Sequence, residues 1–131
     1  MTSLDLMRSD VPYAVSYLDM PNHLQARAQG LCWRFNQLDP ADAEGRAAIL
    51  SELFGTWHPR ATVKPVFRCD YGFNIHFRGF ALVNYNCVFL DTSPIRIGEG
   101  AFIAPGCVLG CAGHAVDPAQ RAEGIQTSAP I

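Results

Sequence analysis

The residue best suited to chemistry is His114, which stands where a repeating pattern gives way to a polar loop, residues 113–118. An imidazole with a pKa near neutrality can take up a proton and return it, as general acid–base catalysis requires. Loops that leave a rigid scaffold often carry such reactive side chains. His114 is therefore a candidate general base.

Two cysteines near His114 raise an alternative. Cys107, Cys111 and His114 are close enough in sequence to suggest a zinc site. However, Cys107 occupies the small position of the repeat described next, which indicates packing, and no fourth ligand is evident. We therefore expect no metal. Cys111 acting as a nucleophile with His114 as its base is a second alternative.

A six-residue repeat supplies the scaffold. Its apolar positions are Phe77, Val83, Phe89, Ile97, Ile103 and Leu109, and four places after each stands a small residue: Ala81, Cys87, Ser93, Ala101, Cys107 and Gly113. This period suits neither an alternating strand nor an α-helix but is typical of a parallel β-helix. Chance recurrence in a glycine-rich β-sandwich is the alternative. We predict two successive coils, residues 77–94 and 97–114, with apolar residues inside and small residues at tight corners.

The N-terminal part of the chain, from Met1 to about Gly55, has a helical pattern. One short helix runs from Ser3 towards Arg8, and a second follows Pro21 with an apolar stripe. A third is predicted to begin with Asp39 as its cap and Pro40 at its first position, and to end at Gly55 in a left-handed conformation. The stripes are Leu24, Ala28, Leu31, Cys32 and Phe35 in the second helix, and Ala43, Ala47, Leu50 and Phe54 in the third. Such short helices must pack against something larger.

Composition excludes several classes of protein. The chain has 131 residues, 49% of them hydrophobic, and a net charge of −2. These values describe one globular domain. Lys64 is the only lysine and basic residues form no run, so nucleic-acid binding is not expected. No apolar segment approaches the ~20 residues that span a membrane, and the N-terminal segment does not resemble a signal peptide. Five cysteines in apolar contexts fit reduced thiols, so we expect a cytoplasmic protein without membrane association.

Several segments, in order, carry a family resemblance. They are residues 67–76 (FRCDYGFNIH), 84–88 (NYNCV), 90–91 (LD), 113–114 (GH) and 117–118 (DP) with Arg121. With them the chain resembles the maltose/galactoside O-acetyltransferase family of hexapeptide-repeat enzymes. Residues 34–36 and 53–55 are similar to the helical cap of these sugar acetyltransferases. The resemblance covers nearly the whole chain.

The resemblance implies a mainly β fold: a left-handed parallel β-helix over residues 57–131, preceded by a helical cap over residues 1–56. It implies transfer of an acetyl group from acetyl-CoA to a sugar hydroxyl by direct attack, which argues against an acyl-enzyme on Cys111. His114 is then the general base, and Asp70 and Asn84 contact the acceptor sugar. A turn cap for Asp70 and a corner-stacking amide for Asn84 are the structural alternatives. Family members are trimers with active sites between subunits, so a homotrimer is expected.

Departures from the family pattern concern the sugar. Thr92 stands where the galactoside branch has an acidic sugar contact, which favours a maltose-like acceptor. The family also has an acidic sugar contact near its N-terminus, and Asp19 aligns with that position only with a shift in the alignment. Related enzymes continue with further coils that form most of the coenzyme groove. We therefore expect the β-helix to be incomplete at its C-terminal end and the cofactor-binding residues to lie mainly in later coils. The alternative function is a non-catalytic oligomerisation or interaction module.

Overall fold

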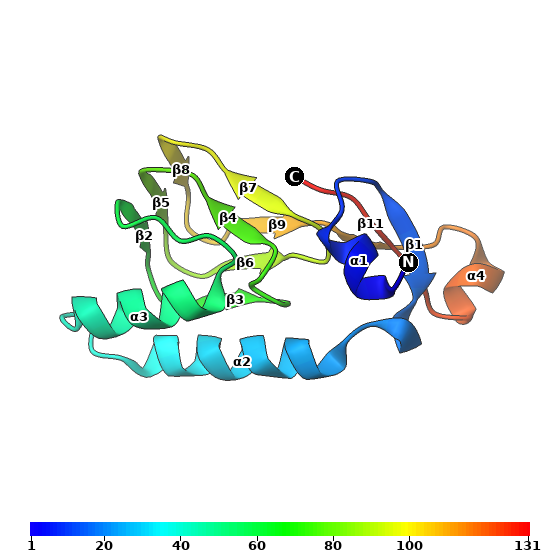
Figure 1. The fold of residues 1–131 in the computed structure, drawn as a ribbon, viewed down its shortest axis with the longest axis horizontal. Coiled ribbons are helices and arrows are strands. Elements are labelled where there is room, and N and C mark those ends of the chain that lie inside the picture. The colour runs from blue at the N-terminus through cyan, green and yellow to red at the C-terminus, as the bar shows by residue number, and fades with distance from the viewer.

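A computed structural model describes all residues, 1–131, and its centre is a left-handed parallel β-helix (Figure 1). Its strands form three parallel sheets in the orders β2–β5–β8, β3–β6–β9 and β4–β7. The register pairs Val63 with Val83 and Val83 with Ile103, so successive coils have the same length. The strands are β2 (Ala61–Val63), β3 (Phe67–Cys69), β4 (Ile75–Phe77), β5 (Ala81–Val83), β6 (Cys87–Leu90), β7 (Ile95–Ile97), β8 (Ala101–Ile103) and β9 (Val108–Gly110).

The apolar positions of the repeat face the interior, as predicted: Phe77, Val83 and Phe89 are fully buried. The prediction that the small positions lie at corners holds for Ser93, in the corner between β6 and β7, but is wrong for those that lie in strands. Ala81 and Cys87 begin strands β5 and β6 and are as buried as the apolar residues two places later, because alternate residues of a strand share one face. The predicted coil lengths were also short. The long corners between β3 and β4 and between β6 and β7 add residues to each coil. A further coil, beginning at β2, precedes the two predicted ones and lies within the predicted β-helix range of 57–131.

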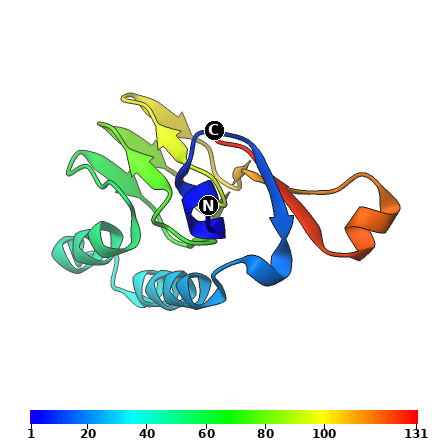
Figure 2. The ribbon, with the colours of Figure 1, turned by 45° about the vertical axis from the view of Figure 1, so that its right-hand side comes forward.

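After β9 the chain leaves the coil and forms a protruding arm. The arm consists of β10 (Ala112–His114), α4 (Pro118–Ala122) and β11 (Ile125–Ser128). The N-terminal strand β1 (Tyr13–Ser16) joins it in an antiparallel sheet of order β1–β11–β10, which Figure 2 shows extending beside the β-helix. The Ile131 amide then donates to the Pro94 carbonyl at 3.0 Å, which returns the chain alongside β7.

The helical cap consists of α1 (Ser3–Arg8), a 3-10 turn at Tyr17–Asp19, α2 (Asn22–Gln37) and α3 (Ala43–Leu53). The apolar side of α2 packs against α3 and β3, and four of its five predicted stripe residues are buried, Leu24 being half-buried. None of the helices combines the length and apolar character needed to cross a membrane.

The start of α3 differs from the prediction. Asp42, not Asp39, caps it by accepting a hydrogen bond from the Gly45 amide at 2.9 Å, while Asp39 accepts one from Ala41 in the preceding turn. The apolar stripe predicted for this helix was wrong in its first two residues, because Ala43 and Ala47 are exposed. The buried residues of α3 are Ile49, Leu50 and Leu53.

Gly55 is not in a left-handed conformation. Its lack of a side chain serves a close approach instead, because a Cβ there would lie 2.1 Å from the Phe73 carbonyl oxygen. This glycine therefore lets the end of α3 meet the corner before β4.

Candidate active site

His114 ends strand β10, directly opposite Gln126 on β11. Its side chain is exposed and borders two adjoining cavities of about 280 Å³ each. The preceding Gly113 lets the strands approach, since a Cβ there would lie 2.8 Å from the Thr127 hydroxyl. The imidazole of His114 therefore lies on a hydrogen-bonded strand of the arm and faces a concave surface.

Asp70 borders one of these cavities from the other side, where β3 ends. Its carboxylate accepts a hydrogen bond from Gln25 Nε2 of α2 at 3.2 Å and caps no turn. Burial raises the pKa of Asp70, and the Gln25 hydrogen bond opposes that rise. The structure therefore brings the predicted residues Asp70 and His114 to one cavity, with a helical-cap residue orienting the carboxylate.

The other walls of this cavity come from residues 17–25, from the two long corners of the β-helix and from β10 and β11, and the sequence singled out only Thr92 among them. The remaining residues are Tyr17, Met20, Asn22, Gln25, Tyr71, Thr92, Ala112 and Gln126. Tyr71 had a usable signal, since it directly follows Asp70. Gln25 had none, because a polar residue in a helix gives no indication of what it faces. Asp19 does not line the cavity.

A buried carboxyl group supports the corner that carries Asp70. Asp91 is fully buried and accepts hydrogen bonds from the amides of Tyr71 at 2.8 Å and Asn74 at 3.3 Å. Burial raises the pKa of Asp91 to about 7, while those hydrogen bonds act in the opposite direction. The Asn74 side chain donates to the Met7 carbonyl at 2.8 Å. This network ties α1 to the β3–β4 corner.

Asn84 lies elsewhere, between β5 and β6, and does not line the cavity at His114. Its side-chain oxygen accepts a hydrogen bond from the next amide, that of Tyr85, at 2.9 Å. Within one chain the structure therefore does not bring Asn84 together with His114 and Asp70.

The three residues of the zinc alternative point in different directions. Cys111 is buried and its thiol donates to the Ser93 carbonyl at 3.4 Å, while Cys107 packs against the core and His114 faces the cavities. The chain has no group of three or more His, Cys, Asp or Glu side chains close enough to hold a metal ion. Cys111 and His114 likewise form no hydrogen-bonded nucleophile–base pair.

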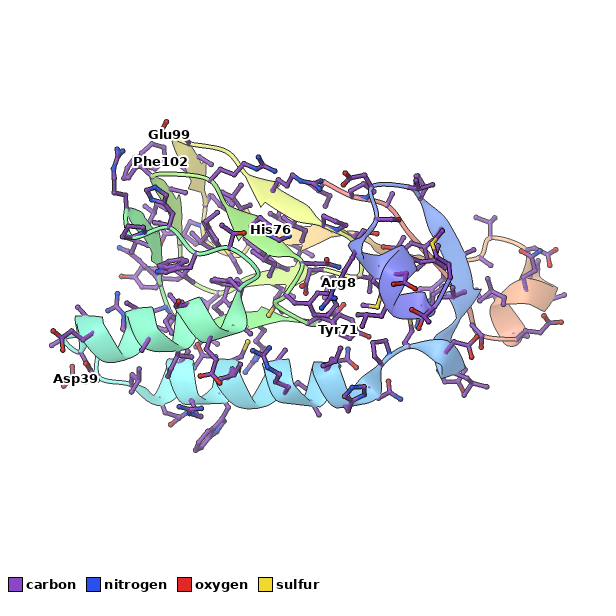
Figure 3. The ribbon with its side chains drawn as sticks, viewed as in Figure 1. Arg8, Asp39, Tyr71, His76, Glu99 and Phe102 are labelled. Carbon is purple, nitrogen blue, oxygen red and sulfur yellow. The ribbon has the colours of Figure 1, made fainter.

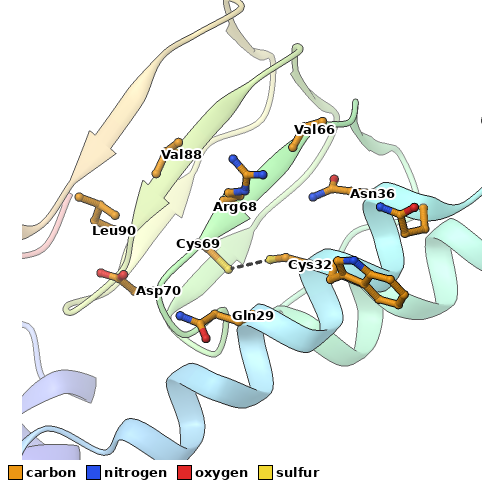
Figure 4. A pocket seen from close by; sticks show the side chains of 11 residues that line it. Gln29, Cys32, Asn36, Val66, Arg68, Cys69, Asp70, Val88 and Leu90 are labelled. Carbon is orange, nitrogen blue, oxygen red and sulfur yellow. Dashed lines mark hydrogen bonds between the residues drawn. The ribbon is translucent and has the colours of Figure 1, made fainter.

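A larger cavity of about 510 Å³ lies between α2 and the outer face of β3 and β6 (Figure 4). Asp70 borders it as well as the cavity at His114. Inside it the thiols of Cys32 and Cys69 are in contact, with 3.7 Å between their sulfur atoms. Asp70 therefore lies where the two cavities meet.

The arrangement suits proton transfer from a small hydroxyl compound. A carboxylate can accept a hydrogen bond from one hydroxyl group while an exposed imidazole takes the proton of another. Each cavity at His114 lies near the lower end of the volumes typical of small-molecule sites, about 300–1,000 Å³.

Comparisons with known proteins agree in pointing to one family. The profile described as "Maltose acetyltransferase hexapeptide capping motif" matches residues 21–58. Nodulation protein L of Rhizobium meliloti (strain 1021) is 40% identical over 98 residues, which are 75% of this chain and 54% of that protein. The chain spans about half the length of the curated relatives it matches first.

Solved structures agree over almost the whole chain. A maltose O-acetyltransferase from Clostridium difficile 630 superposes with a TM-score of 0.85 at 33% identity, covering 99% of this chain and 69% of that one. A hexapeptide-repeat acetyltransferase from Vibrio cholerae O1 biovar eltor, complexed with acetyl coenzyme A, gives a TM-score of 0.84 at 29% identity, with the same two coverages of 99% and 69%.

Proposed function

Because the chain belongs to the maltose/galactoside O-acetyltransferase family of hexapeptide-repeat enzymes, we propose that it transfers an acetyl group from acetyl-CoA to a sugar hydroxyl. The observation that carries the proposal is the meeting of His114 and Asp70 at one cavity. The acetyl-CoA complex of the Vibrio cholerae relative supports the choice of donor.

In the proposed reaction Asp70 accepts a hydrogen bond from one sugar hydroxyl and so positions a neighbouring hydroxyl beside His114. Acetyl-CoA supplies a thioester carbonyl as the electrophile. The His114 imidazole takes the proton of the attacking hydroxyl while the new C–O bond forms and the C–S bond breaks. The imidazolium then returns this proton to the leaving sulfur, so the base is regenerated and no acyl-enzyme is needed.

The cavities at His114 fit the acceptor better than the whole donor. At about 280 Å³ each, they have room for a sugar ring and an acetyl group but not for a complete coenzyme. We propose that the rest of the coenzyme is held by residues that do not line these cavities.

We further propose a homotrimer in the cytoplasm. Asn84 lies away from His114 in one chain, so its contact with the sugar would have to come from a neighbouring copy. All five cysteines are free thiols, which suits a reducing compartment.

The test is to incubate the purified chain with acetyl-CoA and maltose or glucose and to measure the coenzyme A released by chromatography. His114→Asn should lower the rate by about 10²- to 10⁴-fold, the usual contribution of a general base. His23→Asn, an exposed histidine on α2, is the matched control and should retain full activity. Turnover that survives His114→Asn would overturn the role of the base. No turnover together with no coenzyme binding would favour the non-catalytic module.

A further inference from the structure

A further cavity, lined by polar side chains, lies on the outer face of the β4–β7 sheet, which is turned towards the viewer in Figure 1. Its volume is about 310 Å³, and only Thr56, His76, Arg78 and Arg96 line it. No apolar side chain contributes, which sets it apart from the cavities at Asp70.

The repeat geometry builds this site. Thr56 forms an isolated parallel bridge with His76, and His76 pairs in turn with Arg96 of β7. These three residues therefore stack on successive coils. Arg78 joins them because Phe77, between His76 and Arg78, points into the core. His76 is labelled on this sheet in Figure 3.

The positive charge of this row is only partly balanced. Asp10 forms an ion pair with Arg96, with 2.5 Å between the two charged groups. Arg78 forms no ion pair, and the remaining ion pair of the chain joins Arg60 to Glu99. Like charges on adjacent strands repel each other. A bound anion would remove that cost.

His76 is poised to respond to such an anion. Its Nδ1 is 3.0 Å from the Thr56 hydroxyl oxygen, which orients the ring. Burial, with Arg96 and Arg78 nearby, lowers the pKa of His76, which favours the neutral ring. The charged groups around the ring are Arg78, which directly follows β4, and Arg96 on β7, whose partner is Asp10. A bound anion favours the imidazolium and must raise this pKa.

We propose that Thr56, His76, Arg78 and Arg96 form a binding site for a tetrahedral oxyanion, with a phosphate group as its natural ligand. Guanidinium groups match the geometry of phosphate oxygens and bind them through two parallel hydrogen bonds. When His76 Nδ1 donates to the Thr56 oxygen, the single hydroxyl proton of Thr56 is available to the same anion oxygens. The site is independent of acetyl transfer, since it lies on a different sheet from Asp70 and His114.

Calorimetric titration of the whole chain with inorganic phosphate and with sulfate tests the proposal. Arg78→Gln should weaken the binding of both ions by about tenfold or more, because one charge-assisted contact is lost. Arg68→Gln is the matched control: it removes one exposed arginine from the outer face of β3 and should leave binding unchanged. Absence of binding, or equal binding by the two variants, would overturn the site.

Two further experiments identify the ligand and the position of His76. Phenyl phosphate distinguishes a phosphate monoester from the free ion: binding as tight as that of inorganic phosphate identifies an esterified ligand, and much weaker binding identifies the free ion. NMR of the His76 imidazole, assigned with His76→Gln, should show its pKa rising when sulfate binds, since sulfate keeps its charge over this pH range. A His76 pKa that sulfate leaves unchanged would contradict the proposed placement.

Discussion

Gln25 of helix α2 and Asp70 of the β-helix are joined by a 3.2 Å hydrogen bond at the point where two cavities meet. The bond connects the helical cap to the carboxylate that shares a cavity with His114. It is also the favourable contact that opposes the effect of burial on the pKa of Asp70. The cap therefore helps to set the orientation and charge of a site residue.

Removing this bond should affect acceptor binding more than the chemical step. We expect Gln25→Ala to raise the KM for the sugar by about three- to tenfold, the equivalent of one typical hydrogen bond of about 1 kcal/mol, with a smaller change in kcat. Gln29→Ala, one turn further along α2, should change neither value. Equal effects of the two variants, measured by coenzyme A release over a range of sugar concentrations, would exclude a positioning role for Gln25.

Asp91 should make stability depend on pH. Its folded pKa of about 7 lies above the ordinary value of 3.8, so the folded state holds a proton that the unfolded state loses first. The proton held by Asp91 therefore stabilises the folded state. This stabilisation is fully present below pH 3.8, is lost as pH rises towards 7, and stays lost at higher pH. We expect Asp91→Asn to flatten the decline in unfolding free energy between pH 4 and pH 8 by up to roughly 4 kcal/mol. Urea unfolding of wild type and variant across this range measures it.

The exposed Glu52→Gln variant provides the control for Asp91. It should leave the pH dependence of unfolding as it is in the wild type. If Asp91→Asn shows the same pH dependence as Glu52→Gln, then Asp91 is ionised in the folded protein at neutral pH and the prediction is wrong.

Two glycine substitutions should have opposite effects. Gly55→Ala would place a Cβ 2.1 Å from the Phe73 carbonyl oxygen. We expect it to lower the free energy of unfolding by about 1–3 kcal/mol. Gly30→Ala lies on α2 with nothing within 4 Å of the new Cβ. Helix propensity should therefore raise stability by about 0.5–1 kcal/mol. The denaturation midpoints of the two variants test this. A midpoint that Gly55→Ala leaves unchanged would mean that the corner before β4 moves aside at little cost in free energy.

The stacked interior of the β-helix should be sensitive to cavities. Phe89 is fully buried and meets Phe67 edge-to-face, with 5.1 Å between ring centroids. Phe89→Ala should therefore cost about 3–5 kcal/mol. Phe102 on the outer face is 69% exposed and contacts Phe80. Phe102→Ala should cost less than about 1 kcal/mol. Similar losses of stability in the two variants, measured by thermal unfolding, would contradict the assignment of Phe89 to the interior of the β-helix and Phe102 to its outer face.

The β-helix and two of the three helices were predictable because their patterns are local. Interior residues such as Val83 and Phe89 recur at a fixed interval, and Ala28 and Phe35 keep helical spacing. The start of α3 was mispredicted because Asp39-Pro40 and Asp42 both offer capping signals, and only packing of Ile49 and Leu53 decides between them. Strand β1 was missed because its partner, β11, lies at the other end of the chain.

The sequence by itself determined the repeat, the family resemblance, and the candidates His114 and Asp70. Only the tertiary structure decided that these two share a cavity, that Gln25 holds the carboxylate, and that Asn84 lies apart within one chain. It also stacked Thr56, His76 and Arg96 on one face. The physical reason is that the winding of the coils and the protruding arm bring distant positions together, and neither the long corners nor the arm follows the local repeat.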